Sequence, residues 1–527
     1  MKKLLKRISL LLVCALTAAT LAACGSDHVI KEEDTTDLYV MILERGYGTE
    51  WLKQLEKGFE AKYPGVDMHV DTTPQREVIE NSIGSGEGFN DTDIYFDVYS
   101  SFYVLENSYR NLFPGYEHGL YDLTDIFDSK IPGEGDTTLG GKMFKYVYEN
   151  FAFTEDGETA YYCLPWATAP MGLYYNADVF KAVYGENYES HLPKTTGQLR
   201  TVAEEIKKAG KVPFTYPGQL DQWYPVIYTW WAQYEGLDSY NRFYEGKALD
   251  PITETYVTSK EIYAQQGRLK ALEELQYFLD ADKGYHESNV NDYGASNFRM
   301  LQARFVTKDM PYAMYPCGDW LAEESKDSLS ADIRMMKTPV LSSIDDRLDS
   351  INGETELLEV ISYVDGEITE LSKEYDENDI EEVRKARNMT YTRSQQHFAY
   401  VPAYTNAEQL VKDFFLYMAS DEAIAIYKDY VNGGFLPFTY DYSGAELSSI
   451  EMSISEILED PVVITDVSDS PLFVKGGLGA FPYTLGTMDA VLGASKTSAI
   501  YKDAYDVWKE MQYSDEAWRQ IVSNSGL

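Results

Sequence analysis

Aromatic side chains and carboxylates are the chemistry-bearing groups that this sequence supplies in excess. Its 527 residues include 44 Tyr and 8 Trp, with 86 Asp and Glu against 45 Lys and Arg. A pyranose ring presents C–H faces that pack on aromatic rings, and hydroxyl groups that need hydrogen-bond donors and acceptors. The composition therefore indicates an uncharged ligand with apolar faces, above all a sugar.

The sequence motifs of nucleophilic, metal-assisted and phosphate chemistry are absent. There is no Gly-x-Ser-x-Gly elbow, His-Glu-x-x-His helix or Walker loop, and Gly46-x-Gly48 lacks the third glycine of a dinucleotide-binding loop. Asp280-Ala-Asp282 lacks the glycine and the later acidic ligands of a calcium loop, and the six His show no metal-ligand spacing. We expect no catalytic residue, no metal and no cofactor.

The first 26 residues have the composition of an export signal. Four basic residues precede an apolar run from Ile8 to Leu21, which is too short to remain as a membrane-spanning helix. The run ends in Leu21-Ala-Ala-Cys24, which resembles the bacterial lipobox, whose Cys becomes the lipidated first residue of the mature chain. We expect residues 1–23 to be removed, Cys24 to carry acyl chains, and the polar residues 24–36 to form a tether. The protein would then lie at the outer face of the cytoplasmic membrane.

Charge and cysteine content limit the partners and the cross-links. The formal net charge of −41 argues against nucleic acid and anionic lipid surfaces as partners. Once Cys14 and Cys24 are assigned to the signal and the anchor, only Cys163 and Cys317 remain. The sequence leaves their pairing open, and free thiols are the favoured interpretation.

The hydrophobic pattern predicts alternating strands and helices. Residues 38–43 form an apolar strand pattern, and a helix with Leu52, Leu55 and Phe59 on one face follows over about 49–63. Further strands are expected at 66–70, 94–99 and 171–175, and a helix capped by Thr195 or Thr196. This order is typical of open, mainly parallel α/β sheets. The acidic stretch over 345–387 is expected to be a solvated helical insertion.

Three later segments resemble the crossing segments of one family of proteins. The first runs from Tyr162 to Phe180 and contains Tyr175, Asn176, Asp178 and Phe180, followed by Leu192-Pro-Lys-Thr-Thr196. The second is Pro311 to Trp320, ending in Gly-Asp-Trp, and the third is His397 to Asn406. In this order, behind a lipobox, they are similar to the extracellular solute-binding lipoproteins of carbohydrate ABC importers, which have a maltose-binding-protein-like fold. The resemblance covers most of residues 38–527, but the acidic stretch departs from it.

The resemblance implies a type II periplasmic-binding-protein fold of two α/β lobes joined by three crossing segments. We expect residues 37–165 and 312–398 in the first lobe, with the acidic insertion near 345–390. Residues 166–311 and 399–527 are expected in the second. Such a protein would bind a sugar, and we expect an oligosaccharide, in the cleft between the lobes and deliver it to the transmembrane subunits of an ABC permease. We expect a membrane-anchored monomer.

The candidate ligand-binding residues lie where strands and crossing segments end. They are Glu44, Tyr47 and Trp51 after the first strand, Tyr99 and Ser100 after the 94–99 strand, Trp166 in the first crossing, Trp223 and Trp230 in an aromatic segment of the second lobe, and Asp319 and Trp320 in the second crossing. Each aromatic side chain could equally pack in a core. Asp319 is the better-supported candidate because its crossing placement is argued separately.

Two other functions remain compatible with the sequence. A secreted glycosidase needs only two suitably spaced carboxylates, and 86 acidic residues always offer pairs. A solute-binding lipoprotein could instead take a peptide or another solute and feed a transporter or a sensor. Turnover of the sugar would distinguish the first alternative, and the range of ligands bound would distinguish the second.

Overall fold

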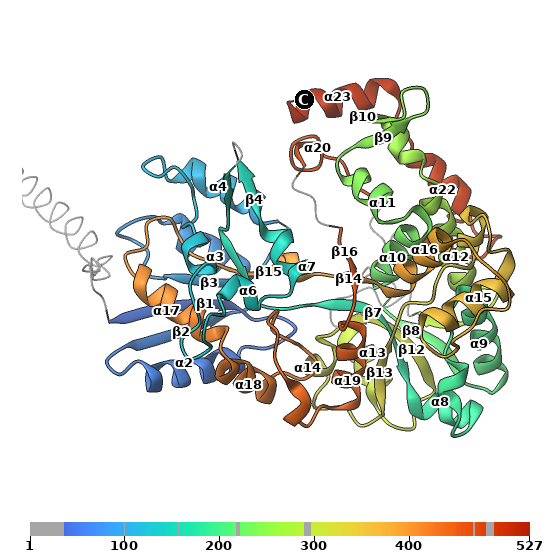
Figure 1. Ribbon diagram of the computed structural model, residues 1–527, viewed down its shortest axis with the longest axis horizontal. Coiled ribbons are helices and arrows are strands. Elements are labelled where there is room, and N and C mark those ends of the chain that lie inside the picture. The colour runs from blue at the N-terminus through green and yellow to red at the C-terminus, as the bar shows by residue number, and fades with distance from the viewer. Residues whose placement is uncertain are drawn as a thin grey trace, which may run out of the picture.

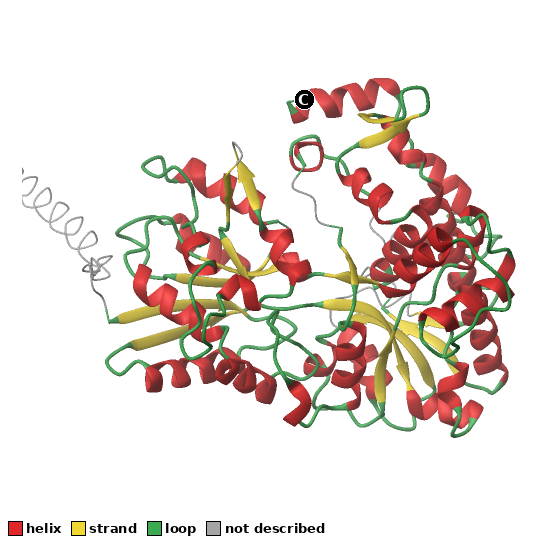
Figure 2. Ribbon diagram, in the orientation of Figure 1, coloured by secondary structure: helices red, strands yellow, loops and turns green. Residues whose placement is uncertain are grey.

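The protein has two α/β lobes that lie side by side with the chain crossing between them (Figure 1). A computed structural model describes residues 36–99, 101–155, 158–217, 222–288, 297–466, 470–480 and 490–526. The expected signal 1–23, lipidation site Cys24, nearly all of the tether 24–36, and Ser100 lie outside the described residues. Helices flank the sheet of each lobe (Figure 2).

The first lobe is built on a five-stranded sheet of order β2-β1-β3-β15-β6. β1 is parallel to β2 and β3, so all three end at the same edge, whereas β15 is antiparallel to β3 and β6. The predicted apolar face of α2 is confirmed, since Leu52, Leu55 and Phe59 are fully buried. The elements are β1 (Asp37–Leu43), α2 (Glu50–Lys62), β2 (Asp67–Thr73), α3 (Arg76–Gly84), β3 (Ile94–Val98), α4 (Phe102–Leu112), α7 (Lys145–Tyr148), β6 (Cys163–Pro165), β15 (His397–Tyr400), α17 (Glu408–Met418) and α18 (Asp421–Tyr430).

The second lobe is built on a sheet of order β11-β8-β12-β7-β14-β16, with β13 also paired to β7. Asn176 begins α8 by accepting hydrogen bonds from Asp178 N and Val179 N, and Thr195 caps α9 as predicted. The elements are β7 (Pro170–Asn176), α8 (Ala177–Tyr184), α9 (Thr196–Lys208), β8 (Val212–Tyr216), α10 (Tyr224–Glu235), α11 (Leu237–Tyr244), β9 (Lys247–Asp250), β10 (Thr255–Thr258), α12 (Gln266–Leu279), β11 (His286–Ser288), α13 (Asn297–Val306), β12 (Tyr312–Gly318), α14 (Leu321–Glu324), β13 (Ile333–Met336), α15 (Gly353–Val364), α16 (Glu377–Asn388), β14 (Met389–Thr392), α19 (Ser449–Ile457), β16 (Val462–Ile464), α20 (Pro471–Val474), α22 (Ala504–Glu510) and α23 (Asp515–Ser525).

The expected lobe boundaries differ from the observed sheets. Residues 312–398 were expected in the first lobe, but β12 pairs with β7 and β8, and β14 pairs with β7, within the second-lobe sheet. Residues 399–527 were expected in the second lobe, but α17 and α18 pack in the first-lobe core. The strand β12 therefore ends at the junction without crossing it, and the chain returns to the first lobe only after β14.

Three short segments connect the lobes and hydrogen-bond to one another. Trp166 N donates to His397 O at 3.0 Å, Arg393 N to Ala169 O at 2.9 Å, and Thr168 N to Phe435 O at 3.0 Å. Ala169 has a φ of +47°, a conformation rare for a residue with a Cβ. The connections between the lobes thus form a narrow hydrogen-bonded bundle.

The acidic insertion is an ordered part of the second lobe. Its helices α15 and α16 enclose a small core that contains Leu357, Ile361 and Val383. Gln233 Nε2 on α10 donates to Ala386 O at 2.9 Å, which fastens α16 to the second lobe. The expectation of an element on the first lobe is therefore wrong, because its helices are fastened to the second lobe. The expected helices are found, and each buries one apolar face while its other face is partly exposed.

Cys163 and Cys317 are both buried and no disulfide joins them, as favoured from the sequence. They lie in different sheets, on β6 and β12. In the part of the chain that the structure describes, no helix combines the length and the apolar character needed to cross a bilayer.

Candidate functional site

A hydrogen bond joins the two lobes where β1 and β12 end. Tyr47, in the loop after β1, donates its hydroxyl proton to Asp319 Oδ1, in the turn after β12. Asp319 is fully buried, and its backbone N–H donates to Pro170 O at 3.1 Å. The loop after β1 of the first lobe and the turn after β12 of the second thus fix this carboxyl group at the junction.

The Asp319 carboxyl group has an open hydrogen-bonding position. Burial raises its pKa well above the usual range, although the Tyr47 hydrogen bond opposes this shift. Asp319 Oδ2 and the buried hydroxyls of Tyr146 and Tyr427 form no hydrogen bond with any described residue. The pKa values of both tyrosines are raised, chiefly by burial and further by the nearby Asp319. The junction therefore holds unsatisfied polar atoms that a ligand or water could satisfy.

An aromatic cluster surrounds this hydrogen bond on the first-lobe side. The Tyr47 ring meets Trp166 edge-on at a centroid distance of 5.5 Å, and Trp51 stacks on Trp166 at 5.7 Å. Trp320, from the second lobe, lies 6.2 Å from Tyr47. The structure thus brings five of the ten predicted residues together: Tyr47, Trp51, Trp166, Asp319 and Trp320.

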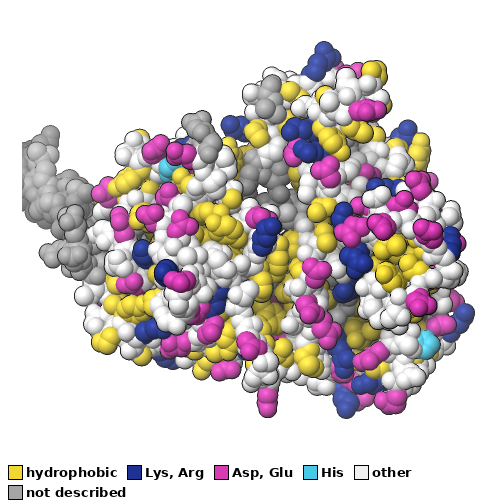
Figure 3. Space-filling view, in the orientation of Figure 1, with side chains coloured by type: hydrophobic (Ala, Val, Ile, Leu, Met, Phe, Trp, Pro, Cys, Tyr) yellow, Lys and Arg dark blue, Asp and Glu magenta, His cyan; other side chains and the backbone are white. Residues whose placement is uncertain are grey.

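Three partly buried aromatic side chains contact both lobe cores. They are Trp320, Tyr146 on α7 and Tyr442 between α18 and α19. A Cβ on Gly46 would lie 2.7 Å from the Trp320 side chain, so glycine there lets the first-lobe loop approach the indole. Hydrophobic side chains gather where the lobes meet (Figure 3). Partly accessible rings beside an unsatisfied carboxyl oxygen are the groups that a sugar requires.

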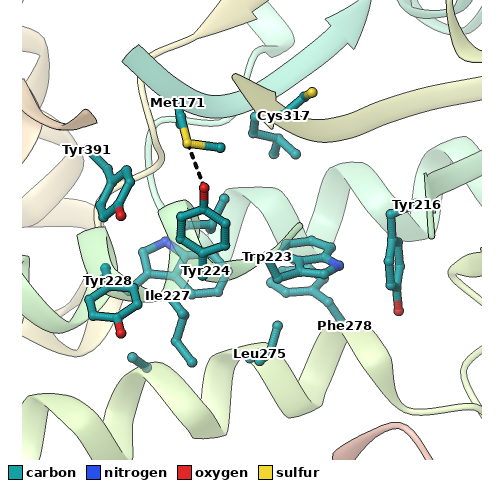
Figure 4. Packing of buried hydrophobic residues seen from close by; sticks show 14 of the residues in the cluster. Met171, Tyr216, Trp223, Tyr224, Ile227, Tyr228, Leu275, Phe278, Cys317 and Tyr391 are labelled. Carbon is teal, nitrogen blue, oxygen red and sulfur yellow. Dashed lines mark hydrogen bonds between the residues drawn. The ribbon is translucent and has the colours of Figure 1, made fainter. Parts of the chain in front are cut away.

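Trp223 and Trp230 belong to the second-lobe core instead. Trp230 is fully buried and donates from Nε1 to Pro339 O at 3.1 Å, and Trp223 is 4% exposed. Figure 4 shows Trp223 pointing into the core with Tyr216 and Phe278 nearby. Their shared helix face, noted in the sequence, is therefore a packing face. Trp51 is likewise fully buried, and its indole supports Trp166.

The other predicted residues lie at the carboxyl ends of β1 and β3. Glu44 is exposed, and Tyr99 is partly buried beneath the Arg76 guanidinium, 3.8 Å from its ring centroid. The backbone N–H of Tyr99 donates to Gln396 O at 2.8 Å. The end of β3 therefore lies beside the Arg393–His397 connection between the lobes. Glu44 and Tyr99 contact Thr73, Arg76 and Gln396, away from Asp319, and Ser100 lies outside the described part.

The sequence did not identify His397 or the two bridging tyrosines. His397 is buried against Tyr47 at 5.4 Å and Trp166 at 5.2 Å, and burial lowers its pKa to about 4. His397 begins the segment His397 to Asn406 that resembles the third crossing, so its position in the sequence could have marked it as a junction residue. Tyr146 and Tyr442 lie in segments that carried no recognisable motif, so nothing in the sequence separated them from the other 42 tyrosines.

One group of potential metal ligands occurs within the described ranges. Asp37, Asp67 and His69 have ligand atoms within 4.8 Å of one another, at the start of β1 and β2 and thus at the opposite end of β1 from Tyr47. Strand pairing brought these residues together without any sequence spacing that would have indicated it. This group does not contribute to the lobe junction.

Comparison with known proteins identifies similar sequences and folds. The family model for bacterial extracellular solute-binding proteins matches residues 45–273. The diacetylchitobiose-binding protein NgcE of Streptomyces coelicolor is 22% identical over 309 residues, which span 58% of this chain and only 57% of that protein.

Solved structures cover nearly the whole chain. A chitin oligosaccharide-binding protein superposes with a TM-score of 0.58 at 16% identity, covering 94% of this chain and 100% of that one. A probable secreted solute-binding lipoprotein from Streptomyces coelicolor gives 0.57 at 11% identity, covering 93% and 100%. The predicted two-lobed fold is confirmed, and these similar proteins are binding proteins.

Proposed function

We propose that this protein is a bacterial extracellular solute-binding protein, which captures an oligosaccharide between its lobes and delivers it to an ABC permease. The observation that carries the proposal is the group at the lobe junction: Trp320, Tyr146 and Tyr442 contact both cores, beside the open Asp319 oxygen. The sequence match over residues 45–273 supports a binding role.

The junction offers the two kinds of contact that a sugar needs. Trp320 and the bridging tyrosines supply ring faces for the apolar side of a pyranose. Asp319 Oδ2 and the hydroxyls of Tyr146 and Tyr427 supply hydrogen-bonding atoms that are buried, so pairing them with sugar hydroxyls relieves a desolvation cost. No nucleophile is needed, because the sugar is held and released unchanged.

Ligand binding would bias the relative position of the lobes. The lobes meet through the hydrogen-bonded segments at Trp166–Ala169, Arg393–His397 and Phe435. A ligand that contacts both lobes stabilises a closed arrangement by the contacts that only this arrangement provides. A closed, loaded form is what a permease could distinguish from the empty form.

The amino-terminal residues complete the proposal. Acyl chains on Cys24 would hold a monomer at the outer face of the cytoplasmic membrane, with residues 24–36 as tether. More than one chain is needed for stable anchoring, because one acyl chain gives only reversible binding. This anchor would keep the protein near the transmembrane subunits of the permease.

The experiment is a thermal-shift screen against mono- and oligosaccharides. Diacetylchitobiose, chitin oligosaccharides and raffinose are the first probes, because similar proteins are named for binding them or were solved with them. A ligand at a hundred times its Kd should add about 2.7 kcal/mol to the free energy of unfolding. A selective shift with the sugar recovered intact would support the proposal.

Two other results would contradict it. Hydrolysed sugar in the recovered sample would indicate a glycosidase. A shift with peptides or other solutes, and none with any saccharide, would indicate a different ligand class on the same fold.

A further inference from the structure

The acidic insertion forms one wall of a cavity on the second lobe. The cavity has a volume of about 650 Å³ and lies between α16, β13 and α19. Arg384, Arg387 and Asn388 line it from α16, where their i, i+3 and i+4 spacing places them on one face. Lys337, immediately after β13, lines it from the opposite side.

Most charges around this cavity are neutralised by neighbours. Arg334 pairs with Asp332 at 3.0 Å and with Glu189 at 3.2 Å, and Lys194 pairs with Glu367. Arg387 pairs with Asp365 at 3.0 Å through Nη2, and Nε donates to the same carboxylate. These pairs hold the walls together and leave little net charge.

Two cationic groups of the cavity are incompletely compensated. Lys337 has no ion-pair partner among the described residues, and its Nζ instead donates to Asn388 Oδ1 at 2.9 Å. Arg387 Nη1 is buried, and no acceptor within the described part lies in hydrogen-bonding range. Burial lowers the pKa of Lys337, and the positive charge of Arg387 lowers it further. Two like charges thus face each other in a chain whose net charge is −41.

We infer that the insertion builds a second binding site, for a small oxyanion such as a carboxylate or a phosphate group, held between Lys337 and Arg387. A guanidinium and an ammonium group that line one cavity can give the charge-assisted hydrogen bonds that such anions take. The Asn388 amide nitrogen adds a neutral donor at the same position. The anion supplies an acceptor for Arg387 Nη1, which has none among the described residues, and a direct ion pair for Lys337.

Acidic side chains also line this cavity. Glu456 and Asp460 line it and are exposed, so they repel an anion that stays at the rim. Asp460 also acts on the Lys337 ammonium group, so an oxyanion bound there must gain more from Lys337 and Arg387 than it loses to this repulsion. The site lies on one lobe and uses none of the junction residues, so it stands independently of the proposed sugar site.

The test is calorimetric titration of the purified chain with inorganic phosphate and, separately, with acetate, at low ionic strength with chloride as the reference anion. Lys337→Gln should weaken the affinity about tenfold or more, the effect of losing one charge-assisted hydrogen bond. Lys145→Gln is the matched control, since it makes the same charge change at a highly exposed lysine of the first lobe, and should leave the affinity unchanged.

The outcomes separate clearly. Binding of both anions supports a general oxyanion site, and binding of phosphate alone supports a site for a phosphate group. Lack of saturation by either anion up to about 10 mM would overturn the inference, as would equal affinity of Lys337→Gln and the unmodified protein. Thermal unfolding of Lys337→Gln without anion, matched to the parent, checks that the variant is folded. Saccharide binding is measured in the same samples and should not change.

Discussion

The two lobes use buried tryptophans in different ways. Trp166 of the first lobe contacts Tyr47, whose hydroxyl reaches Asp319 of the second lobe. Trp230 of the second lobe packs on Phe278 at 6.1 Å, inside its own lobe. Both indoles are nearly inaccessible, so burial alone does not distinguish them. The difference lies in their elements: one follows a strand end at the junction, and the other lies within a helix.

The largest expected effect is on the stability of the second lobe. Trp230→Ala removes a fully buried indole and its hydrogen bond to Pro339 O, and should lower the free energy of unfolding by about 3–5 kcal/mol. Denaturant unfolding measures the loss. Saccharide affinity under conditions where the variant is folded should remain unchanged. A comparable loss of affinity would mean that the second-lobe cluster also serves binding.

The next effect tests how well the first-lobe cluster is sealed from water. Burial lowers the pKa of His397 to about 4, from 6.5 in an unfolded chain. Between these values the unfolded state takes up a proton that the folded state does not, so stability is lost as the pH falls from 6.5 to 4. The loss amounts to about 3 kcal/mol.

His397→Gln should remove this acid-side loss and flatten the dependence of stability on pH over that range. Denaturant unfolding at several pH values between 4 and 7 gives the slope of the free energy of unfolding against pH for the variant and for the parent. Equal slopes for the variant and the parent would show that His397 is accessible to water, and that the cluster is open.

Trp320→Ala should mainly weaken saccharide binding, whereas Trp230→Ala should mainly lower the free energy of unfolding. Because Trp320 is only partly buried and contacts both cores, its removal should weaken saccharide binding by about 1–3 kcal/mol while costing less stability. Calorimetric titration with the best saccharide of the screen measures the affinity. Unchanged affinity would place Trp320 outside the binding surface.

The smallest effect concerns the hydrogen bond between the lobes. Tyr47→Phe keeps the ring packing but removes the donor to Asp319, and should cost about 1 kcal/mol of stability. Tyr174→Phe is the matched control, since its hydroxyl donates to Gly318 O at 3.2 Å within the second lobe. Only the Tyr47 variant should change the ligand-induced compaction measured by solution X-ray scattering. Equal compaction in both variants would mean that this bond does not couple the lobes.

The fold was predictable because its signals are local. Apolar strand runs, the face of α2 and the cap of α9 depend on neighbours within a few residues, and each is found as expected. The lobe boundaries depended on the sheet that each strand joins. Nothing local distinguishes a β12 that pairs with β7 from one that crosses to the first lobe, so that part of the prediction differs from the structure.

The candidate site was predictable only where strand ends marked it. Tyr47 and Asp319 follow β1 and β12, and the structure places them in contact across the junction. Trp223 and Trp230 are candidates because they are aromatic and share a helix face. A face that packs in a core has the same two properties as a face that binds a ligand. Tyr146 and Tyr442 reach the junction through the tertiary packing of short helical segments, which the sequence pattern does not encode.

The most direct test of the central claim is a crystal structure of the protein with the saccharide that gives the largest thermal shift. The account predicts a sugar ring against Trp320, a hydroxyl paired with Asp319 Oδ2, and contacts from both lobes. A saccharide bound on a single lobe, with Asp319 Oδ2 still unpaired, would contradict it.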